Sequence, residues 1–354
     1  MQVEPEKPDE IISNYRKRID AEIMNYFNIK YSEVKDDLSK TAIELIREFT
    51  INGGKRLRPI FMILGHNLFA NEDESIFRAS ISIELAQSYL LIHDDIIDQS
   101  DIRRGKPSMH VAIQRKLLGN GRESRRLAEG LAIVAGDLAE AYAHESLLSS
   151  GFRSSDVVRA DLELSRTIET TGYGQFLDIM SADLDNFCMN DLMRLHLWKT
   201  AKYTLEGPLS MGAILSGTRE DIFPLKSYGK LLGIAFQLKD DILGLFGDEK
   251  TIGKSIFSDV NEGKKTLLML KAIEFSGQSD KKFIIESLKT GNITRDDFEK
   301  LKKIVIDTGS YDYSVRLMEK LVEGARKYLL QVRGNDNAKK VLNWLSEYLI
   351  NRDH

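Results

Sequence analysis

The chain has 354 residues, of which 42% are hydrophobic, and a formal net charge of −4 at pH 7. This length permits two domains, although a large helical fold formed as one unit is equally compatible with it. Nucleic-acid binding requires a strongly basic surface, and a chain with a slightly negative net charge gives no sign of one. We therefore expect no nucleic-acid partner.

The single cysteine, Cys188, excludes an internal disulfide framework and is typical of a reducing compartment. The acidic, proline-bearing segment 1–15 has neither the basic nor the apolar region of a signal peptide. No apolar stretch approaches the roughly 18 residues that a spanning helix needs. We therefore expect a cytoplasmic protein without a transmembrane segment.

Apolar residues recur at positions i, i+3, i+4 and i+7 along most of the chain, which predicts amphipathic helices. In chain order the predicted helices cover residues 10–27, 39–51, 74–98, 124–148, 156–180, 190–217, 225–247, 264–277, 294–309, 311–332 and 337–351. No alternating pattern typical of β-strands competes with them. We predict an all-α fold with a single helical domain over residues 1–354.

Two of the predicted helices carry paired aspartates toward their C-terminal ends. Asp94 and Asp98, in the stretch LIHDDIID, are four positions apart and share a helix face. Asp240 and Asp241 form the second pair, which a basic loop follows. Such helices can face one another across a bundle, and Mg²⁺ prefers carboxylate oxygens completed by substrate phosphates. The alternative is that each pair is an ordinary solvated helix end.

A third motif, GGKRLRP, combines backbone freedom with positive charge. Gly53 and Gly54 permit close approach of a ligand, and Lys55, Arg56 and Arg58 place three cations within four positions. Arginine can grip a phosphate through two hydrogen bonds. The motif predicts an anion site, with a solvated basic turn as the alternative.

The three motifs, in this order, resemble those of the trans-isoprenyl diphosphate synthases, the polyprenyl synthetase family. They are GGKRLRP, DDIIDQSDIRRG, and FQLKDDILGLFGD with the lysines that follow it. The resemblance spans about residues 53–265 and is closest to archaeal-type geranylgeranyl diphosphate synthases. It implies the isoprenoid synthase fold, with many antiparallel helices around a deep central cavity, and a homodimer. It also implies that an allylic diphosphate ionises and that isopentenyl diphosphate attacks the resulting carbocation.

The resemblance assigns roles to individual residues. Three Mg²⁺ ions would be held by Asp94, Asp98 and Asp240. The allylic diphosphate would be contacted by Arg103, Lys199 and Lys254. Isopentenyl diphosphate would be contacted by Lys55, Arg58, Gln87 and Arg104. Oxygen dipoles toward the carbocation would come from Thr200 and Gln237, and a further polar pair in the cavity from Gln175 and Asp178.

Tyr89 is the residue that we expect to limit product length. It lies five positions before Asp94, a rise of roughly 7.5 Å along a helix. One aromatic residue here, followed by the smaller Leu90, is similar to archaeal geranylgeranyl diphosphate synthases and predicts a C20 product. The alternative for Tyr89 is an ordinary half-buried core tyrosine. The alternative for the product is farnesyl or a longer polyprenyl diphosphate. A non-catalytic partner subunit is a further alternative.

The second aspartate motif departs from the fuller family pattern. Gly244 stands where that pattern has a third aspartate, which leaves the role of Asp241 open. Asp248, further along, is a candidate to replace it. We interpret His110 and His196, which have no partner evident in the sequence, as hydrogen-bonded structural residues.

Overall fold

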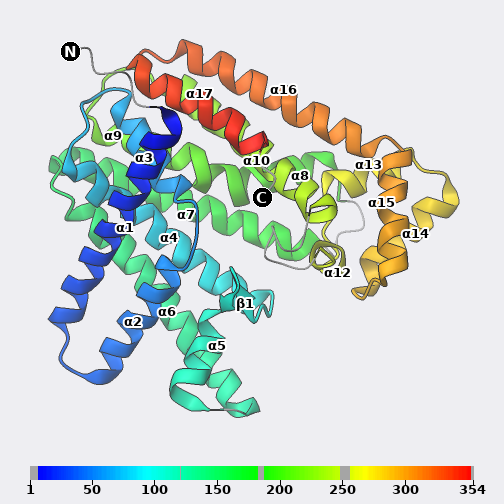
Figure 1. The fold of residues 1–354 in the computed structure, drawn as a ribbon, viewed down its shortest axis with the longest axis horizontal. Coiled ribbons are helices and arrows are strands. Elements are labelled where there is room, and N and C mark those ends of the chain that lie inside the picture. The colour runs from blue at the N-terminus through cyan, green and yellow to red at the C-terminus, as the bar shows by residue number, and fades with distance from the viewer. Residues whose placement is uncertain (1–6, 120, 182–186, 248–255, 352–354) are drawn as a thin grey trace. The chain divides into compact units, whose positions relative to one another are not determined.

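The computed structural model describes residues 7–119, 121–181, 187–247 and 256–351 (Figure 1). The all-α prediction is confirmed, because helices account for nearly all regular structure in these ranges. The described residues contain only one short antiparallel pair of strands, β1 (Ile102–Arg103) and β2 (Lys106–Pro107). None of the described helices is both long enough and apolar enough to cross a membrane.

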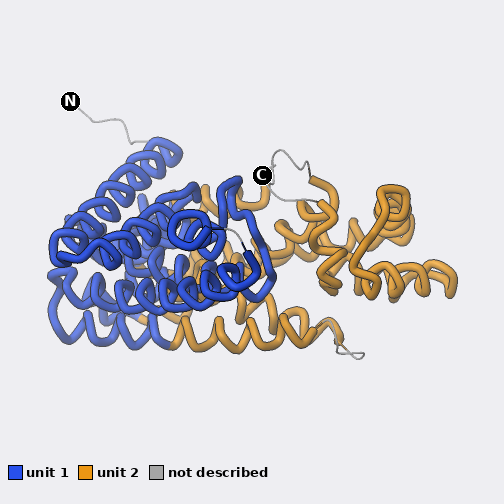
Figure 2. Tube along the Cα trace, turned by 90° about the horizontal axis from the view of Figure 1, so that it is seen from below, with its two compact units in different colours: residues 1–165, 208–220, 334–340 blue, residues 166–207, 221–333, 341–354 orange. Residues whose placement is uncertain are grey.

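The chain divides into two compact units, which Figure 2 shows in blue and orange. Unit 1 comprises residues 1–165, 208–220 and 334–340. Unit 2 comprises residues 166–207, 221–333 and 341–354. The expectation of one helical domain over the whole chain stays a prediction.

Unit 1 contains the first aspartate motif and the glycine-rich basic motif. Besides β1 and β2, its elements are α1 (Pro8–Glu33), α2 (Asp37–Ile51), α3 (Leu57–Asn67), α4 (Glu74–Ile97), α5 (Met109–Ile113), the π-helix η1 (Gln114–Leu118) and α6 (Arg122–Leu148), with parts of α7 (Ser154–Ser181), α9 (Gly207–Leu215) and α17 (Asp336–Asn351). Helix α4 begins after Asp73, whose side chain accepts a hydrogen bond from the backbone N–H of Ile76. It packs mainly against α6 and α3, and its middle is buried.

Unit 2 contains the second aspartate motif. Its elements are α8 (Met189–Leu195), the π-helix η2 (His196–Glu206), α10 (Phe223–Phe246), α12 (Ser258–Asn261), α13 (Leu267–Phe275), α14 (Gln278–Thr290), α15 (Arg295–Asp307) and α16 (Ser310–Gln331), with the remaining parts of α7, α9 and α17. Helix α10 packs against α16 and η2. Its fully buried Tyr228 donates a hydrogen bond of 2.7 Å to the carbonyl of Leu342 on α17.

One predicted helix differs from the observed element. The continuous helix expected over 190–217 consists of α8, the π-helix η2 and α9. The π-helix is 11 residues long. π-Helices are rare in proteins, and many of those that occur lie at functional sites. This one contains Lys199 and Thr200, two of the residues with an assigned role.

Candidate functional site

The first aspartate motif forms the last turn of α4 in unit 1. The backbone N–H of Asp98 donates to the carbonyl of Asp94 at 2.8 Å, which continues the helix to Asp98. Arg103 on β1 folds back onto this turn, with its Nε 2.6 Å from Asp95 Oδ1 and its Nη2 3.3 Å from Asp94 Oδ2. Burial raises the pKa of the fully buried Asp95 to about 6, although Arg103 opposes the shift. Arg103 is therefore fixed beside the aspartates that it follows in sequence.

Tyr89 lies one turn before this motif and is half-buried. Its ring centroid is 4.9 Å from that of His93, in an edge-to-face arrangement. His93 Nε2 lies 3.0 Å from the carbonyl oxygen of Ile133 on α6, and a Cβ atom on Gly136 would come within 2.4 Å of the same nitrogen. His93 is thus a hydrogen-bonded packing residue, and Tyr89 rests against it. The role of Tyr89 in product length stays a prediction.

The basic motif forms the end of the loop between α2 and α3 together with the first turn of α3, which contains Arg58. Gly53, Gly54 and Arg56 all have left-handed backbone angles, with φ of 68°, 95° and 53°. The structure corrects one expectation here: Arg56 is 3% exposed and pairs with Glu84 of α4, so it does not present a cation to a ligand as Lys55 and Arg58 can.

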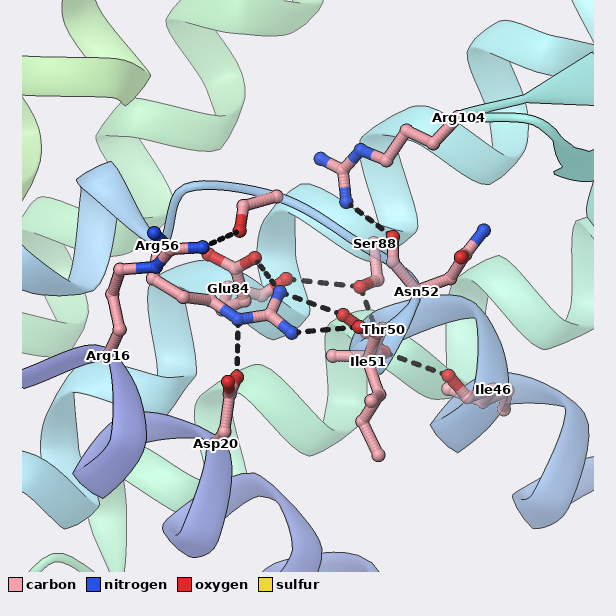
Figure 3. Close-up of polar contacts among 11 residues, drawn as sticks. Arg16, Asp20, Ile46, Thr50, Ile51, Asn52, Arg56, Glu84, Ser88 and Arg104 are labelled. Carbon is pink, nitrogen blue, oxygen red and sulfur yellow. Dashed lines mark hydrogen bonds and ion pairs between the residues drawn. The ribbon is translucent and has the colours of Figure 1, made fainter. Parts of the chain in front are cut away.

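The structure brings another assigned residue to this loop. Arg104, which follows β1, donates a hydrogen bond of 3.0 Å from Nη1 to the carbonyl of Asn52 (Figure 3). Gln87 is buried on α4, three positions after Glu84. Unit 1 therefore contains all four residues that the resemblance assigned to isopentenyl diphosphate.

Unit 2 contains a cavity of about 160 Å³ between α7, η2, α10 and the segment around α12. Residues with an assigned role that line it are Asp178, Lys199, Thr200, Gln237 and Asp240. Lys199 is paired with Asp178. Residues at consecutive helix positions point about 100° apart, so of the two paired aspartates Asp241 is buried and Asp240 is partly exposed.

A chain of polar contacts orders the wall of this cavity. The Thr200 hydroxyl donates to Gln237 Oε1 at 2.6 Å, and Gln237 Nε2 donates to Asp241 Oδ1 at 2.8 Å. Asp241 Oδ2 then lies 3.3 Å from His196 Nε2. Because the hydroxyl gives its only proton to Gln237, the Thr200 oxygen has only lone pairs left for other groups. Such an oxygen can stabilise a positive charge on carbon but cannot donate a proton to it.

Glycines let the π-helix η2 approach its neighbours closely. A Cβ atom on Gly174 of α7 would lie 2.5 Å from the backbone nitrogen of Lys199, and one on Gly233 of α10 would lie 2.5 Å from the Cα of Ala201. Any larger side chain at either position would push η2 away. The two glycines therefore set how closely the η2 backbone at Lys199 and Thr200 packs against α7 and α10.

The sequence reasoning missed Asp259, which also lines the cavity. A Cβ atom on Gly244 would lie 2.3 Å from Asp259 Oδ2, so the carboxylate of Asp259 fills the space beside this glycine. Asp259 also pairs with Lys264 at 3.3 Å. Burial alone would lower the pKa of Lys264, but the charges of Asp259 and Glu262 raise it. The available signal was the glycine at 244, where the family pattern has an aspartate, together with the aspartate in the segment SDVNEGKK (258–265).

Two residues named from sequence fall outside the described residues. They are Lys254, assigned to the allylic diphosphate, and Asp248, considered as a replacement for the missing aspartate. The roles assigned to both stay predictions.

A family model described as "Polyprenyl synthetase" matches residues 39–305 of the chain. The chain belongs to the polyprenyl synthetase family. A relative named geranylgeranyl diphosphate synthase, from Sulfolobus acidocaldarius, is 34% identical over 93% of this chain and 98% of its own length. A relative from Aeropyrum pernix, named geranylfarnesyl diphosphate synthase, is 31% identical over 94% of this chain and 99% of its own.

Solved structures of the family have the same fold. The geranylgeranyl pyrophosphate synthase of Corynebacterium glutamicum, complexed with isoprenyl diphosphate and magnesium, superimposes with a TM-score of 0.88. It is 29% identical, and the match covers 96% of this chain and 98% of that one. The family membership and this likeness over nearly the full length make the chain a prenyltransferase.

The aspartates of both motifs fit the divalent ion that this family implies. Within the described ranges, no three or more His, Cys, Asp or Glu side chains are grouped closely enough to form a metal cage. Mg²⁺ does not need one, because it usually keeps several waters and binds through one or two carboxylates together with substrate phosphates. Asp94, Asp98 and Asp240 supply such oxygens at positions that are partly or fully exposed.

Proposed function

We propose that the protein condenses isopentenyl diphosphate with dimethylallyl, geranyl or farnesyl diphosphate to give geranylgeranyl diphosphate. The observation that carries the proposal is the cavity of unit 2, where Lys199, Thr200, Gln237 and Asp240 line one chamber. The full-length similarity to a relative named for this product supports it.

The chain's own groups fit the two charges that this reaction develops. In unit 1, Arg103 is held by Asp95, and in unit 2, Lys199 is held by Asp178, so each presents a fixed cation for a diphosphate. Asp94 and Asp98 in unit 1 and Asp240 in unit 2 would hold divalent ions, three in all with substrate bound. The chemistry that such ions would supply is neutralisation of the diphosphate charge in the transition state.

The carbocation needs different surroundings from the diphosphate. Thr200 directs oxygen lone pairs rather than a proton into its surroundings, because its hydroxyl is bonded to Gln237. The apolar Phe187, Leu192 and Leu195 complete the cavity wall. Such a wall excludes water, which would otherwise quench the cation.

The test is incubation with Mg²⁺, labelled isopentenyl diphosphate and each allylic primer, followed by chromatography of the dephosphorylated products. We expect a C20 alcohol. A C15 alcohol alone, or chains longer than C20, would replace the proposed product by a farnesyl or longer-chain one. No product with any primer would support a non-catalytic partner subunit instead.

A Tyr89 variant in the same product assay tests the proposed role of this residue in product length. We expect Tyr89→Ala to lengthen the product beyond C20, because the ring lies one turn before the metal-binding aspartates and its removal opens space along α4. Tyr173→Ala is a matched control, because Tyr173 is exposed on α7. An unchanged chain length for Tyr89→Ala would remove Tyr89 from the account of product length.

We also propose that the protein is a cytoplasmic homodimer. Unit 1 supports this with exposed apolar side chains on α6 and the first part of α7, among them Leu127, Val134, Val158 and Leu162, each at least 50% exposed. Several large apolar side chains exposed on neighbouring stretches of the chain are consistent with a protein interface. Light scattering should give twice the chain mass, and Val158→Glu with Leu162→Glu should give the single mass. A monomeric wild type would exclude the dimer.

A further inference from the structure

The basic loop between α2 and α3 is built around an arginine that points into the protein (Figure 3). The side chains of Arg56 and Glu84 are 2% and 4% exposed, and their Nη1 and Oε1 atoms are 2.6 Å apart. Arg56 Nε lies 2.7 Å from Asp20 Oδ1 on α1. The guanidinium is thus enclosed by protein groups, so Arg56 is not itself an anion ligand.

Arg56 also closes the C-terminal end of α2. Its Nη1 donates to the carbonyl of Thr50 at 2.9 Å, and its Nη2 donates to the carbonyl of Ile51 at 3.1 Å. The last carbonyls of a helix lack partners within the helix and interact favourably with a cation. A single side chain therefore ties the end of α2 to α1 and α4, and fixes the point where the loop starts.

Two further arginines donate hydrogen bonds to backbone carbonyls of the same loop. Arg104 Nη1 lies 3.0 Å from the Asn52 carbonyl, and Arg16 Nη2 lies 3.5 Å from the Gly54 carbonyl (Figure 3). A Cβ atom on Gly54 would lie 3.0 Å from Arg104 Nη1, a tight contact, and the φ of 95° at this position is itself strained for a residue with a side chain. Burial lowers the pKa of Arg104, and the carboxylate of Glu84 acts in the opposite direction. Glu84 forms its ion pair with Arg56, whereas Arg104 is held by the Asn52 carbonyl and feels Glu84 only through their charges.

The loop holds a backbone conformation that needs such support. Arg56 has φ of 53°, a left-handed value that residues with a side chain adopt rarely and at an energetic cost. The four hydrogen bonds of its guanidinium hold it there. Without them, we expect the backbone around Gly53 and Gly54 to relax, because glycine has the widest choice of conformations.

We propose that Arg56 is a positioning residue for the diphosphate of isopentenyl diphosphate, which it does not touch. It fixes the loop so that Lys55 before it and Arg58 after it reach the ligand, and Glu84 is the buried charge that keeps Arg56 in place. This inference rests on the proposed function, because that function supplies the ligand.

The experiment separates positioning from stability with a double substitution. Removing one partner of a buried ion pair leaves an uncompensated charge, whereas removing both relieves it. We expect Arg56→Met to lower the thermal midpoint and to raise the KM for isopentenyl diphosphate by about tenfold or more, as for the loss of a charged contact. Arg56→Met with Glu84→Gln should regain most of the midpoint but keep the raised KM. The KM for the allylic substrate should stay at its wild-type value.

Two further variants control the comparison. Arg56→Lys keeps the charge but not the planar fork that reaches several carbonyls, so it should recover part of the stability and little of the KM. Arg18→Met with Glu72→Gln removes a more exposed Arg–Glu pair of unit 1 and should change neither KM. A double variant at 56 and 84 with a normal KM, or equal increases in both KM values, would overturn the proposal.

Hydrogen exchange gives a readout that does not depend on turnover. Amides of residues 50–58 should exchange faster in the double variant at 56 and 84 than in the wild type, while those of α6 stay unchanged. Should the wild type consume no isopentenyl diphosphate, the proposed function fails, and exchange then decides whether Arg56 holds the loop. Unchanged exchange in this segment would overturn the positioning role.

Discussion

The two aspartate pairs have the same sequence but different partners. In unit 1 the buried Asp95 pairs with a cation, Arg103, at 2.6 Å. In unit 2 the buried Asp241 accepts a hydrogen bond of 2.8 Å from the neutral amide of Gln237. In both pairs the first aspartate is the more exposed one. The comparison teaches that the inward aspartate orients a neighbouring side chain, while the outward one is the aspartate that we propose as a metal ligand.

This difference matches the charge that each region serves in the proposed reaction. A fixed guanidinium beside Asp95 suits the negative charge of a diphosphate. A fixed amide and hydroxyl beside Asp241 suit a positive charge on carbon, because they offer oxygen dipoles without a net charge. In the proposed reaction the same Asp-Asp dipeptide thus serves a negative charge in unit 1 and a positive charge in unit 2. The side chain that pairs with its second aspartate makes the difference.

The largest effect should come from the outward aspartates. Asp94→Asn and Asp240→Asn should each lower kcat by roughly 10²–10³-fold, the usual loss when a group that stabilises developing charge is removed. Both should also raise the Mg²⁺ concentration for half-maximal rate. Asp156→Asn, a change to a buried aspartate of α7 that pairs with Arg153, is the control and should leave both quantities unchanged. A normal rate for either variant would contradict the metal role of that aspartate.

A smaller effect should come from the inward aspartate of unit 2. Asp241→Ala removes the acceptor for Gln237, so we expect kcat to fall by about 10- to 100-fold with little change in either KM. Asp241→Asn keeps an oxygen acceptor and should recover most of the rate. Steady-state kinetics with both substrates measures this split. Equal losses for Ala and Asn would mean that the charge of Asp241, rather than its hydrogen bond, matters.

Much of this arrangement could be predicted from sequence, because it depends on local periodicity. The predicted helix 74–98 corresponds to α4 (Glu74–Ile97), and residues four apart on it necessarily share a face. Arg103 follows closely in sequence, so its pairing with Asp94 and Asp95 needs only a short turn. Local spacing therefore predicted most of the long helices and the acidic end of α4, but it missed α3 and α14, which no predicted range covers.

Three features could not be predicted because they depend on distant residues. Arg56 points inward because of Asp20 and Glu84, which lie 36 and 28 positions away. The π-helix η2 has the same apolar spacing as an α-helix, so periodicity alone does not separate them. Asp259 of α12 fills the space beside Gly244 of α10, which lies on a different helix. In each case tertiary contacts, rather than local pattern, decide the outcome.

A substitution at Gly244 tests, through protein stability, whether the Asp259 carboxylate fills the space beside this glycine. Gly244→Ala should destabilise the protein by about 1–3 kcal/mol, because its Cβ would come within 2.3 Å of Asp259 Oδ2. Gly130→Ala on α6 meets nothing within 4 Å and should instead stabilise slightly. Urea unfolding measures both, and adding Asp259→Ala to Gly244→Ala should relieve the loss. A Gly244→Ala variant as stable as Gly130→Ala would show that Asp259 moves away freely.

The smallest effect concerns a buried histidine of unit 1, His110, whose Nε2 lies 3.6 Å from Asp101. Burial and the charge of Arg125 lower the pKa of His110 below its ordinary value. Below about pH 6.5 the unfolded chain therefore binds a proton that the folded chain resists, and stability falls as pH falls, by at most about 1.4 kcal/mol per pH unit. Urea midpoints at pH 7.5 and 5.5 should drop less for His110→Gln than for the wild type. Equal drops would assign the pH dependence to other groups and leave His110 a neutral packing residue throughout this range.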